Sequence, residues 1–320
     1  MILGNHRDAW VAGAVDPSSG TAAVLETGRA LAMLRDAGWK PRRTIVWCSW
    51  DAEEYMLLGS TEWAEQHDHL LRNRAVSYIN LDSAVSGGLR GFGAQATPQF
   101  DDLIRDVAKT VYDPEGEYDS MYDAWKAKQN MPLPSSSGHS AEHDSAAGPE
   151  PQVGRLGSGS DYTPFIQHLG IPSVALGYSG EYPVYHSQYD SLYWMENFGD
   201  ERTENCPTGF CRHAAISTYV GALVMRLADD KVLPFNYTNY AVVMRGYADD
   251  CAPPPPACLS ACVSACVFCL PACLPACLLI AASCILHALW PLHLNMLCVA
   301  VRCNRCRTRS AIRKRAAWHP

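Results

Sequence analysis

The sequence predicts an α/β protein in which a mostly parallel sheet is flanked by helices. Two observations indicate this fold class. Short apolar runs typical of buried strands recur along the first 180 residues, and segments with helical periodicity lie between them. Strands that alternate with helices usually pair in parallel, because each helix carries the chain back across the sheet.

The same patterns place the individual elements. Strands are expected at residues 1–5, 43–50, 75–82 and 171–178, and helices at residues 18–38, 57–67, 97–112, 161–170 and 208–230. In the first helix, the buried face is expected to hold Ala23, Leu25, Ala30, Leu31 and Leu34. Residues 131–157 are rich in Ser, Gly, Ala and Pro, which predicts a surface loop that contains His139 and His143.

The composition changes near Asp250 and divides the chain in two. Residues 1–250 contain every acidic residue and have a net charge of −14, whereas residues 251–320 contain seven basic residues and no acidic ones. We therefore expect a folded domain over residues 1–250 and a tail without a confident fold over residues 251–320. A strongly acidic body is a poor ligand for nucleic acid, so no nucleic-acid partner is expected.

The tail begins as a low-complexity tract of Cys, Pro and Ala and has no charged residue from Cys251 to Val301. Its apolar stretch at about residues 278–301 has the length of a membrane span, and the Arg-rich residues after it would suit the cytoplasmic side. His287, Pro291, His293 and Asn295 oppose that interpretation. The alternative is that the tail is a translated non-coding stretch.

Three further signals are short. Cys206 and Cys211 are close enough in sequence to form a disulfide in an oxidising compartment, and residues 236–238 (Asn-Tyr-Thr) form a glycosylation sequon. The chain begins with MILGNHRDAW, inside a predicted strand and without a signal-peptide pattern. We therefore expect a chain truncated at its amino end.

Polar side chains follow the ends of the predicted strands. The first strand is followed by His6 and Asp8, the second by Asp51, Glu53 and Glu54, and the third ends on Asp82. Asp16 lies in the loop after the first strand, and His186 lies just past the last one. Because ligands of open parallel sheets bind beyond the carboxyl ends of the strands, these nitrogen and oxygen donors predict a metal site, with zinc a suitable ion.

A simpler interpretation of residues 51–54 is the start of a helix. Asp51 would cap the helix, Glu54 would reach back to it, and negative charge is favoured at a helix N-terminus. In the metal-site interpretation, one carboxylate binds a metal while its neighbour transfers a proton. This stretch alone leaves both interpretations open.

Six stretches carry a family resemblance when they are read in order: ILGNHRDAWVAGAVDPSSG, RRTIVWCSWDAEEYMLLGSTEWAE, YINLDS, LGSGSDY, YPVYHSQYD and LPFNYTNYAVVMRGYAD. Together they resemble the glutamate carboxypeptidase II family of co-catalytic zinc peptidases, which is related to the transferrin receptor. The resemblance covers nearly all of residues 1–250 and points to plant or algal members. It implies the α/β fold of zinc aminopeptidases and carboxypeptidases.

The resemblance also implies roles for individual residues. One zinc ion would be bound by His6 and Asp82, a second by Glu54 and His186, with Asp16 bridging both and Glu53 acting as the catalytic general base. Because every ligand position is filled, the chain differs from the receptor branch, which lacks a working metal centre. Further contacts to the ligands or the substrate are expected from Asp8, Asp51, Gly159, Ser160 and Tyr185. Glu62 and Glu65 match a calcium site of the mammalian enzyme.

These residues predict a metallopeptidase with two zinc ions, acting as a carboxypeptidase on small peptides. One alternative is an aminopeptidase with the same metal centre, and another is an inactive fragment or receptor-like module. Residues 171–187 contain no Arg or Lys, so a preference for acidic substrate side chains is not expected. Family members are membrane-anchored, with an extracytoplasmic catalytic domain, and form homodimers through a helical domain that is missing here.

Overall fold

The computed structural model describes residues 1–87, 91–129 and 150–251. The elements in chain order are β1 (Ile2–His6), α1 (Ser18–Asp36), β2 (Val46–Trp50), α2 (Leu58–Gln66), α3 (Asp68–Arg74), β3 (Tyr78–Asn80), β4 (Gly91–Ala96), η1 (Pro98–Phe100), α4 (Asp101–Ala108), α5 (Met121–Lys128), η2 (Pro164–His168), β5 (Ser173–Ser179), α6 (Leu192–Trp194), η3 (Met195–Gly199), α7 (Cys211–Asp229) and α8 (Tyr237–Cys251). Residues Met1–Val243 form one compact unit, and a second unit begins at Met244. The predicted boundary at residue 250 stays a prediction.

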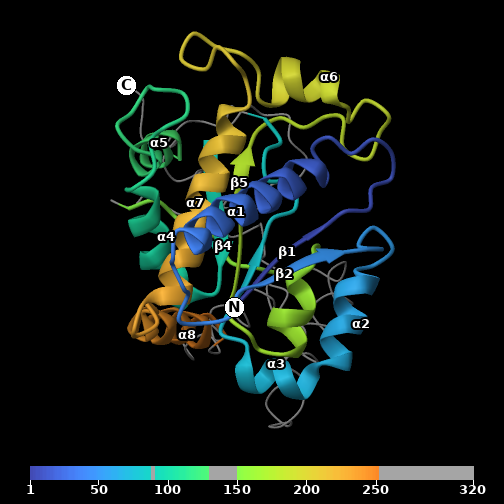
Figure 1. Cartoon of the computed structure of the whole chain (residues 1–320). Helices are drawn as coiled ribbons and strands as arrows, with labels where there is room; N and C mark the ends of the chain where they lie inside the picture. Colours follow the sequence, from blue (N-terminus) through green and yellow to red (C-terminus); the bar gives the residue numbers. More distant parts are fainter. Residues whose placement is uncertain (88–90, 130–149, 252–320) are drawn as a thin grey trace, which may run out of the picture. The chain divides into compact units, whose positions relative to one another are not determined.

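Five strands form one sheet with the order β2-β1-β3-β5-β4 (Figure 1). The first four strands in this order are parallel, and only β4 runs antiparallel to its neighbour β5. The register pairs His6 with Trp50 and Gly4 with Asn80, so β1, β2 and β3 end close together. The predicted mostly parallel sheet is therefore confirmed.

The two faces of the sheet are buried in separate clusters. Along β1, Leu3 packs into one cluster and Ile2 into the other, and along β3 Ile79 and Tyr78 divide in the same way. This alternation follows from the period of two in a strand. Since neither face is left to solvent, these strands read as continuous apolar runs in the sequence.

Helices cover both faces. On one face of the sheet, α1 packs against α7, and α7 also contacts α4 (Figure 1). On the other face, α2 contacts η2, and the ring of Phe165 stacks on the ring of Tyr78 at a centroid distance of 4.0 Å. The flanking helices predicted from the sequence are thus present on both faces.

The buried face of α1 differs from the expected one. The buried residues are Ser19, Gly20, Ala23, Val24, Thr27 and Leu31, whereas Leu25 and Leu34 are exposed by 68% and 39%. The prediction is confirmed for Ala23 and Leu31 and wrong for Leu25, Ala30 and Leu34. The helix packs largely through small residues, and at Gly20 a Cβ atom would collide with the backbone oxygens of Leu81 and Asp82.

Several elements were not predicted. β4 contains Gly91, Gly93 and two alanines and lacks the β-branched residues that mark a strand. The short helices α3 and α5 and the helix α8 were also missed. The expected strands and helices otherwise lie where the patterns place them, including a π-helical turn at η2 in place of a short α-helix.

The described residues also test some of the shorter signals. Cys206 and Cys211 form a disulfide, as expected. The sequon residue Asn236 donates from its amide to Asp102, and its glycosylation stays a prediction. No helix among the described residues combines the length and apolarity needed to cross a bilayer. The expected span at 278–301, the tail, His139 and His143 lie outside the described residues.

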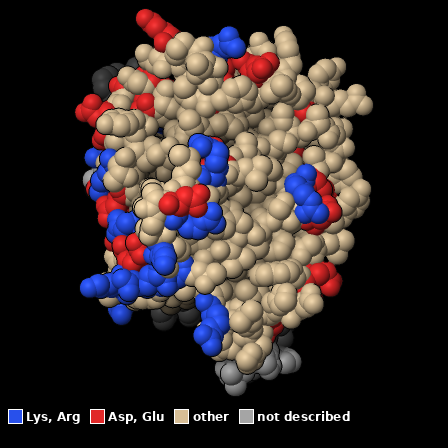
Figure 2. Space-filling model, in the orientation of Figure 1, with Lys and Arg blue, Asp and Glu red and all other residues tan. Residues whose placement is uncertain are grey.

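The surface in the orientation of Figure 1 carries charges of both signs close together, with uncharged residues over much of its centre (Figure 2). Exposed ion pairs occur on the helices, such as Arg29 with Glu26 on α1 and Arg226 with Asp230 at the end of α7. Such solvent-exposed pairs contribute little to the stability of the fold.

Candidate metal centre

The carboxyl ends of the parallel strands place the predicted donors together. β1 ends at His6, β3 ends two residues before Asp82, and β2 leads into the turn that carries Glu53 and Glu54. His186 lies in the segment after β5, where the chain turns back. Because these strands are neighbours and run in one direction, residues far apart in the sequence meet at one edge of the sheet.

One group of donor atoms consists of His6, Glu53 and Asp82, whose donor atoms all lie within 4.8 Å of one another. The Nε2 atom of His6 lies 3.0 Å from Oδ1 of Asp82. His6 is almost fully buried, with 1% of its surface exposed. This group contains the predicted ligands of one metal together with the predicted general base.

The second group consists of Asp16, Glu54 and His186, also within 4.8 Å of one another. The Nε2 atom of His186 lies 3.1 Å from Glu54 and 3.2 Å from Oδ2 of Asp16. The other oxygen of Asp16, Oδ1, lies 3.3 Å from Nε2 of His6. Asp16 therefore faces both imidazoles, one with each carboxylate oxygen, which is the arrangement that a bridging ligand requires.

In this constellation Oε1 of Glu54 is buried without a hydrogen-bond partner among the described residues. Oδ1 of Asp16 is also buried, and its contact to Nε2 of His6 is long, at 3.3 Å. An unpaired carboxylate oxygen in a buried site is costly unless a cation lies next to it. Burial raises the pKa of both carboxyls, which reflects the same cost. Two imidazoles with several carboxylates match the donor set of zinc, so these residues fit that ion.

Ionisation in the site is strongly perturbed. Burial by itself would lower the pKa of His6, but its hydrogen bonds to Asp16 and Asp82 outweigh burial and raise it to about 11. Burial, helped by the nearby charge of Asp82, raises the pKa of Glu53 to about 8. A buried carboxyl with such a pKa is suited to accepting and returning a proton near neutral pH.

Asp8 contacts the site differently from the expectation. The Nδ1 atom of His6 lies 3.0 Å from the backbone oxygen of Asp8, while the nearer carboxylate oxygen is 3.6 Å away. The carboxylate accepts the backbone N–H groups of Glu53 at 3.1 Å and Glu54 at 3.2 Å. The backbone of Asp8 thus orients the imidazole, and its side chain holds the turn that bears the two glutamates.

Asp51 does not cap a helix, so the simpler interpretation of residues 51–54 was wrong. The helix α2 begins at Leu58, after a turn in which Ala52, Met56 and Leu57 have positive φ. The Asp51 carboxylate accepts the N–H of Ala52 and pairs with Arg7 at 2.8 Å. A residue other than glycine is strained when its φ is positive, and such strain is common in segments that carry functional groups.

The expected substrate contacts lie beside the donors to different degrees. Ser160 donates a hydrogen bond of 2.6 Å to Asp82, and Tyr185 stacks on His186 at a centroid distance of 3.7 Å. A cavity of about 280 Å³ opens here, lined by Asp16, Asn80, Asp82, Ser83, Ser160, Tyr162, Ala175, Leu176 and Tyr185. Gly159, with φ of 117°, is not among these lining residues.

Sequence reasoning missed three residues around the centre. Trp10 lies with its ring centroid 6.2 Å from that of His186, and it is 48% exposed. Asn80 donates to Ser160, which in turn holds Asp82. Asp190 accepts the backbone N–H of Asp16. All three stand in stretches that carry the family resemblance, and that position was the available signal.

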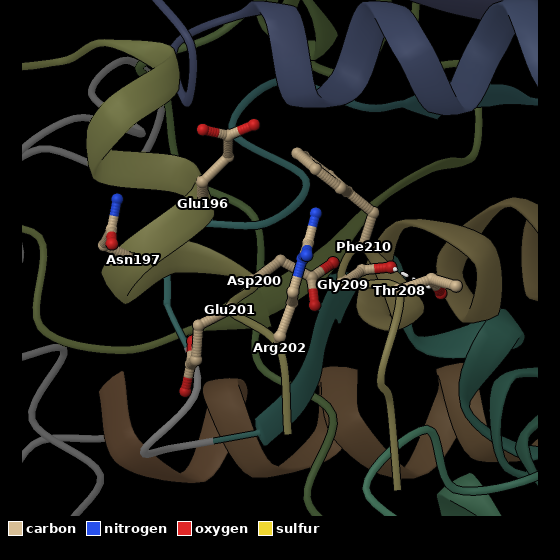
Figure 3. Close-up of a pocket in the computed structure, with 8 residues that line it drawn as sticks. All are labelled: Glu196, Asn197, Asp200, Glu201, Arg202, Thr208, Gly209 and Phe210. Carbon is tan, nitrogen blue, oxygen red and sulfur yellow. Dashed lines mark hydrogen bonds between the residues drawn. The ribbon is translucent and has the colours of Figure 1, made fainter. Parts of the chain in front are cut away.

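The expected calcium site has no support. Glu62 and Glu65 lie on α2, and they belong to neither of the groups of potential ligands found among the described residues. A second, larger cavity of about 470 Å³ is lined by Glu196, Asn197, Asp200, Glu201, Arg202, Thr208, Gly209 and Phe210 (Figure 3). It shares no residue with the donor groups.

Comparisons with known proteins agree with this geometry. The model of peptidase family M28 matches residues 1–128. The chain is 46% identical to the probable glutamate carboxypeptidase LAMP1 of Arabidopsis thaliana over 78% of this chain and 33% of that protein. It is 38% identical to the aminopeptidase NAALADL1 of Rattus norvegicus over 77% of this chain and 32% of that protein. The chain thus spans about a third of the length of these relatives.

Among solved structures, the chain is similar to BSAP, a zinc aminopeptidase from Bacillus subtilis. The two are 18% identical with a TM-score of 0.48, and the similarity covers 73% of this chain and 48% of the other.

Proposed function

We propose, since the chain belongs to peptidase family M28, that it hydrolyses peptide bonds at a centre that holds two zinc ions. The observation that carries this proposal is the position of Asp16, whose two carboxylate oxygens lie 3.3 Å and 3.2 Å from the imidazoles of His6 and His186. His6 and Asp82 would hold one ion, and Glu54 and His186 the other, with Asp16 shared between them.

Zinc at such a centre supplies Lewis-acid chemistry, lowering the pKa of a water molecule and polarising the carbonyl of the scissile bond. Glu53 would accept the proton of the attacking water and deliver it to the nitrogen of the leaving amine. Without metal, burial and the nearby charge of Asp82 raise its pKa to about 8. The backbone N–H groups of Glu53 and Glu54 donate hydrogen bonds to the Asp8 carboxylate. These bonds fix the turn from which the two glutamate side chains extend.

The substrate is proposed to be a small peptide cut at its carboxyl end, as the printed name of the plant relative suggests. The second candidate is an aminopeptidase, because the name of the rat relative gives that activity. Peptides blocked at either terminus distinguish the two. A carboxypeptidase cleaves an amino-blocked peptide and spares a carboxyl-blocked one, and an aminopeptidase does the reverse.

The variant Glu53→Gln tests the mechanism. We expect it to keep two zinc ions per chain and to lose about 10²–10⁴-fold in the rate of hydrolysis, because the amide cannot accept the proton. Metal content and peptide hydrolysis are measured on the same preparations. Glu62→Gln, an exposed change on the neighbouring helix α2, serves as the matched control and should hydrolyse at the wild-type rate.

Two results would contradict the proposal in different ways. Wild-type activity of the Glu53→Gln protein would remove Glu53 from the proton transfer. A wild-type chain that binds fewer than two zinc ions would contradict the two-ion centre. A chain that binds both ions without hydrolysing any peptide would favour the receptor-like module.

A further inference from the structure

Asp190 is a buried carboxylate that is not among the potential metal ligands. It is 2% exposed, and its oxygens accept three hydrogen bonds. Oδ1 accepts the backbone N–H of Val15 at 2.8 Å, and Oδ2 accepts that of Asp16 at 3.2 Å. The hydroxyl of Tyr182 donates to Oδ2 at 2.5 Å. The carboxylate therefore holds the backbone of the residue that faces both imidazoles.

The chain position of Asp190 gives these bonds a second consequence. It follows His186 by four residues, in a segment closed by the bonds from Ser187 N–H to Val184 and from Asp190 N–H to Ser187. The backbone oxygen of Asp190 also accepts the N–H of Ala14, at 3.4 Å. The segment that bears His186 is thus tied directly to the segment that bears Asp16.

His186 has less support from regular structure than His6 has. His6 lies within a strand, whereas His186 stands in a turn with φ of 54° and is one-third exposed. Non-glycine residues hold such a conformation only where the surrounding contacts impose it. Among the described residues, the contacts of Asp190 join this turn to the loop that precedes α1.

We propose that Asp190 is a positioning residue, which sets the separation of Asp16 and His186 and so forms the second zinc position. This inference rests on the proposed function. A carboxylate that accepts two backbone N–H groups fixes both the position and the orientation of the loop that carries them. Loss of a group that orients a metal ligand commonly weakens metal affinity by about 10–100-fold. The position built on Asp16, Glu54 and His186 should depend on Asp190 more than the one built on His6 and Asp82.

The chain provides a matched control in Asp200. This carboxylate is also 2% exposed and also accepts two backbone N–H groups, those of Arg212 at 3.2 Å and His213 at 2.9 Å. It caps the start of α7 and lines the larger cavity, which shares no residue with the donor groups (Figure 3). Its third partner is the imidazole of His213, at 2.7 Å, where Asp190 has the hydroxyl of Tyr182. Asp200→Asn therefore reports the structural cost of losing a comparable buried carboxylate away from the centre.

The experiment compares Asp190→Asn, Asp200→Asn and Tyr182→Phe in the full chain. Each protein is stripped with a chelator and titrated with zinc by calorimetry, and the unfolding temperature of each stripped protein is recorded. We expect two ions on the wild type and about 10–100-fold weaker binding of one of the two on Asp190→Asn. Asp200→Asn should unfold at a lower temperature and bind both ions as the wild type does.

Cobalt provides a second readout that does not depend on activity. Absorption bands of Co²⁺ report the geometry of each position as the ions are added in turn. In Asp190→Asn we expect the bands of the position built on Glu54 and His186 to change more than those of the other position, which shares only Asp16 with it. Tyr182→Phe keeps the two backbone hydrogen bonds to Asp190 and removes only the one from the Tyr182 hydroxyl. It should therefore reduce the affinity for the same ion by a smaller factor.

The outcomes separate this inference from the proposed function. A wild-type chain that binds fewer than two ions contradicts the two-ion centre itself. Two ions on the wild type, with equal affinities on Asp190→Asn, contradict only the positioning role, as does an Asp200→Asn protein that loses one ion to the same extent. If Asp190→Asn does not fold, Tyr182→Phe decides, and unchanged affinities in that variant overturn the inference.

Discussion

Asp161 carries the least satisfied carboxyl group in the neighbourhood of the centre. Its side chain is fully buried, and neither oxygen has a hydrogen-bond partner among the described residues. Burial raises its pKa from 3.8 to about 7. Between these two values the unfolded chain has lost a proton that the folded chain keeps, so this group makes the protein less stable as the pH rises from about 4 to about 7.

Replacing Asp161 by Asn should remove this dependence. In zinc-free protein, we expect the variant to gain stability over the wild type across that pH range, reaching on the order of a few kcal/mol by pH 8. Denaturant unfolding at pH 4.5, 6 and 8 measures the difference. Parallel pH curves for the two proteins would show that Asp161 is already ionised in the folded state.

At this scale, the donors were predictable and their supports were not. His6 and Asp82 were recognisable because each stands at the end of an apolar run, a position that the parallel sheet turns into one edge. Asp8 and Asp190 accept backbone N–H groups far away in the sequence, and Asp51 pairs with the side chain of Arg7. No spacing rule encodes which N–H a carboxylate will meet after folding, so their contacts became known only from the structure.

The helix α1 supports the metal centre, because it starts two residues after Asp16 and packs against the residues that follow β3. A Cβ atom at Gly20 would collide with the backbone oxygens of Leu81 and Asp82. We expect Gly20→Ala to push the helix away from the sheet, costing about 1–3 kcal/mol of stability and weakening zinc binding through Asp82.

Gly221→Ala is the matched comparison, since Gly221 lies within α7 and a Cβ atom there would meet no other atom within 4 Å. That change should stabilise the protein by about 0.5–1 kcal/mol, because alanine favours a helix over glycine. Thermal unfolding and zinc titration of both variants measure the contrast. Equal stability changes in the two proteins would mean that α1 has room to move.

The elements themselves could be predicted where hydrophobic periodicity was strong. β1, β2 and β3 and the long helix α7 lie where the apolar patterns indicated. β4 was missed because it packs small residues against β5, and the buried face of α1 was misplaced for a similar reason. Close packing through glycine and alanine leaves little trace in a hydrophobic pattern, although it decides how near two elements approach.

For the whole domain, zinc should be a main source of stability. Four carboxylates, those of Asp16, Glu53, Glu54 and Asp82, crowd into one edge of the sheet. An ion bound only by the folded state stabilises it by about 4 kcal/mol when free zinc exceeds the dissociation constant a thousandfold. We therefore expect a chelator to lower the unfolding temperature by several degrees and added zinc to restore it. If the unfolding temperature changes with neither the chelator nor added zinc, zinc binding does not stabilise the folded protein.

The separation of the donors along the chain also orders events in time. His6 is synthesised before Asp82 and His186, so a partly made chain lacks some of the donors of each ion. The position built on Glu54 and His186 can therefore be completed only after synthesis has passed His186. A chain interrupted before that turn would leave the ribosome unable to hold its second ion.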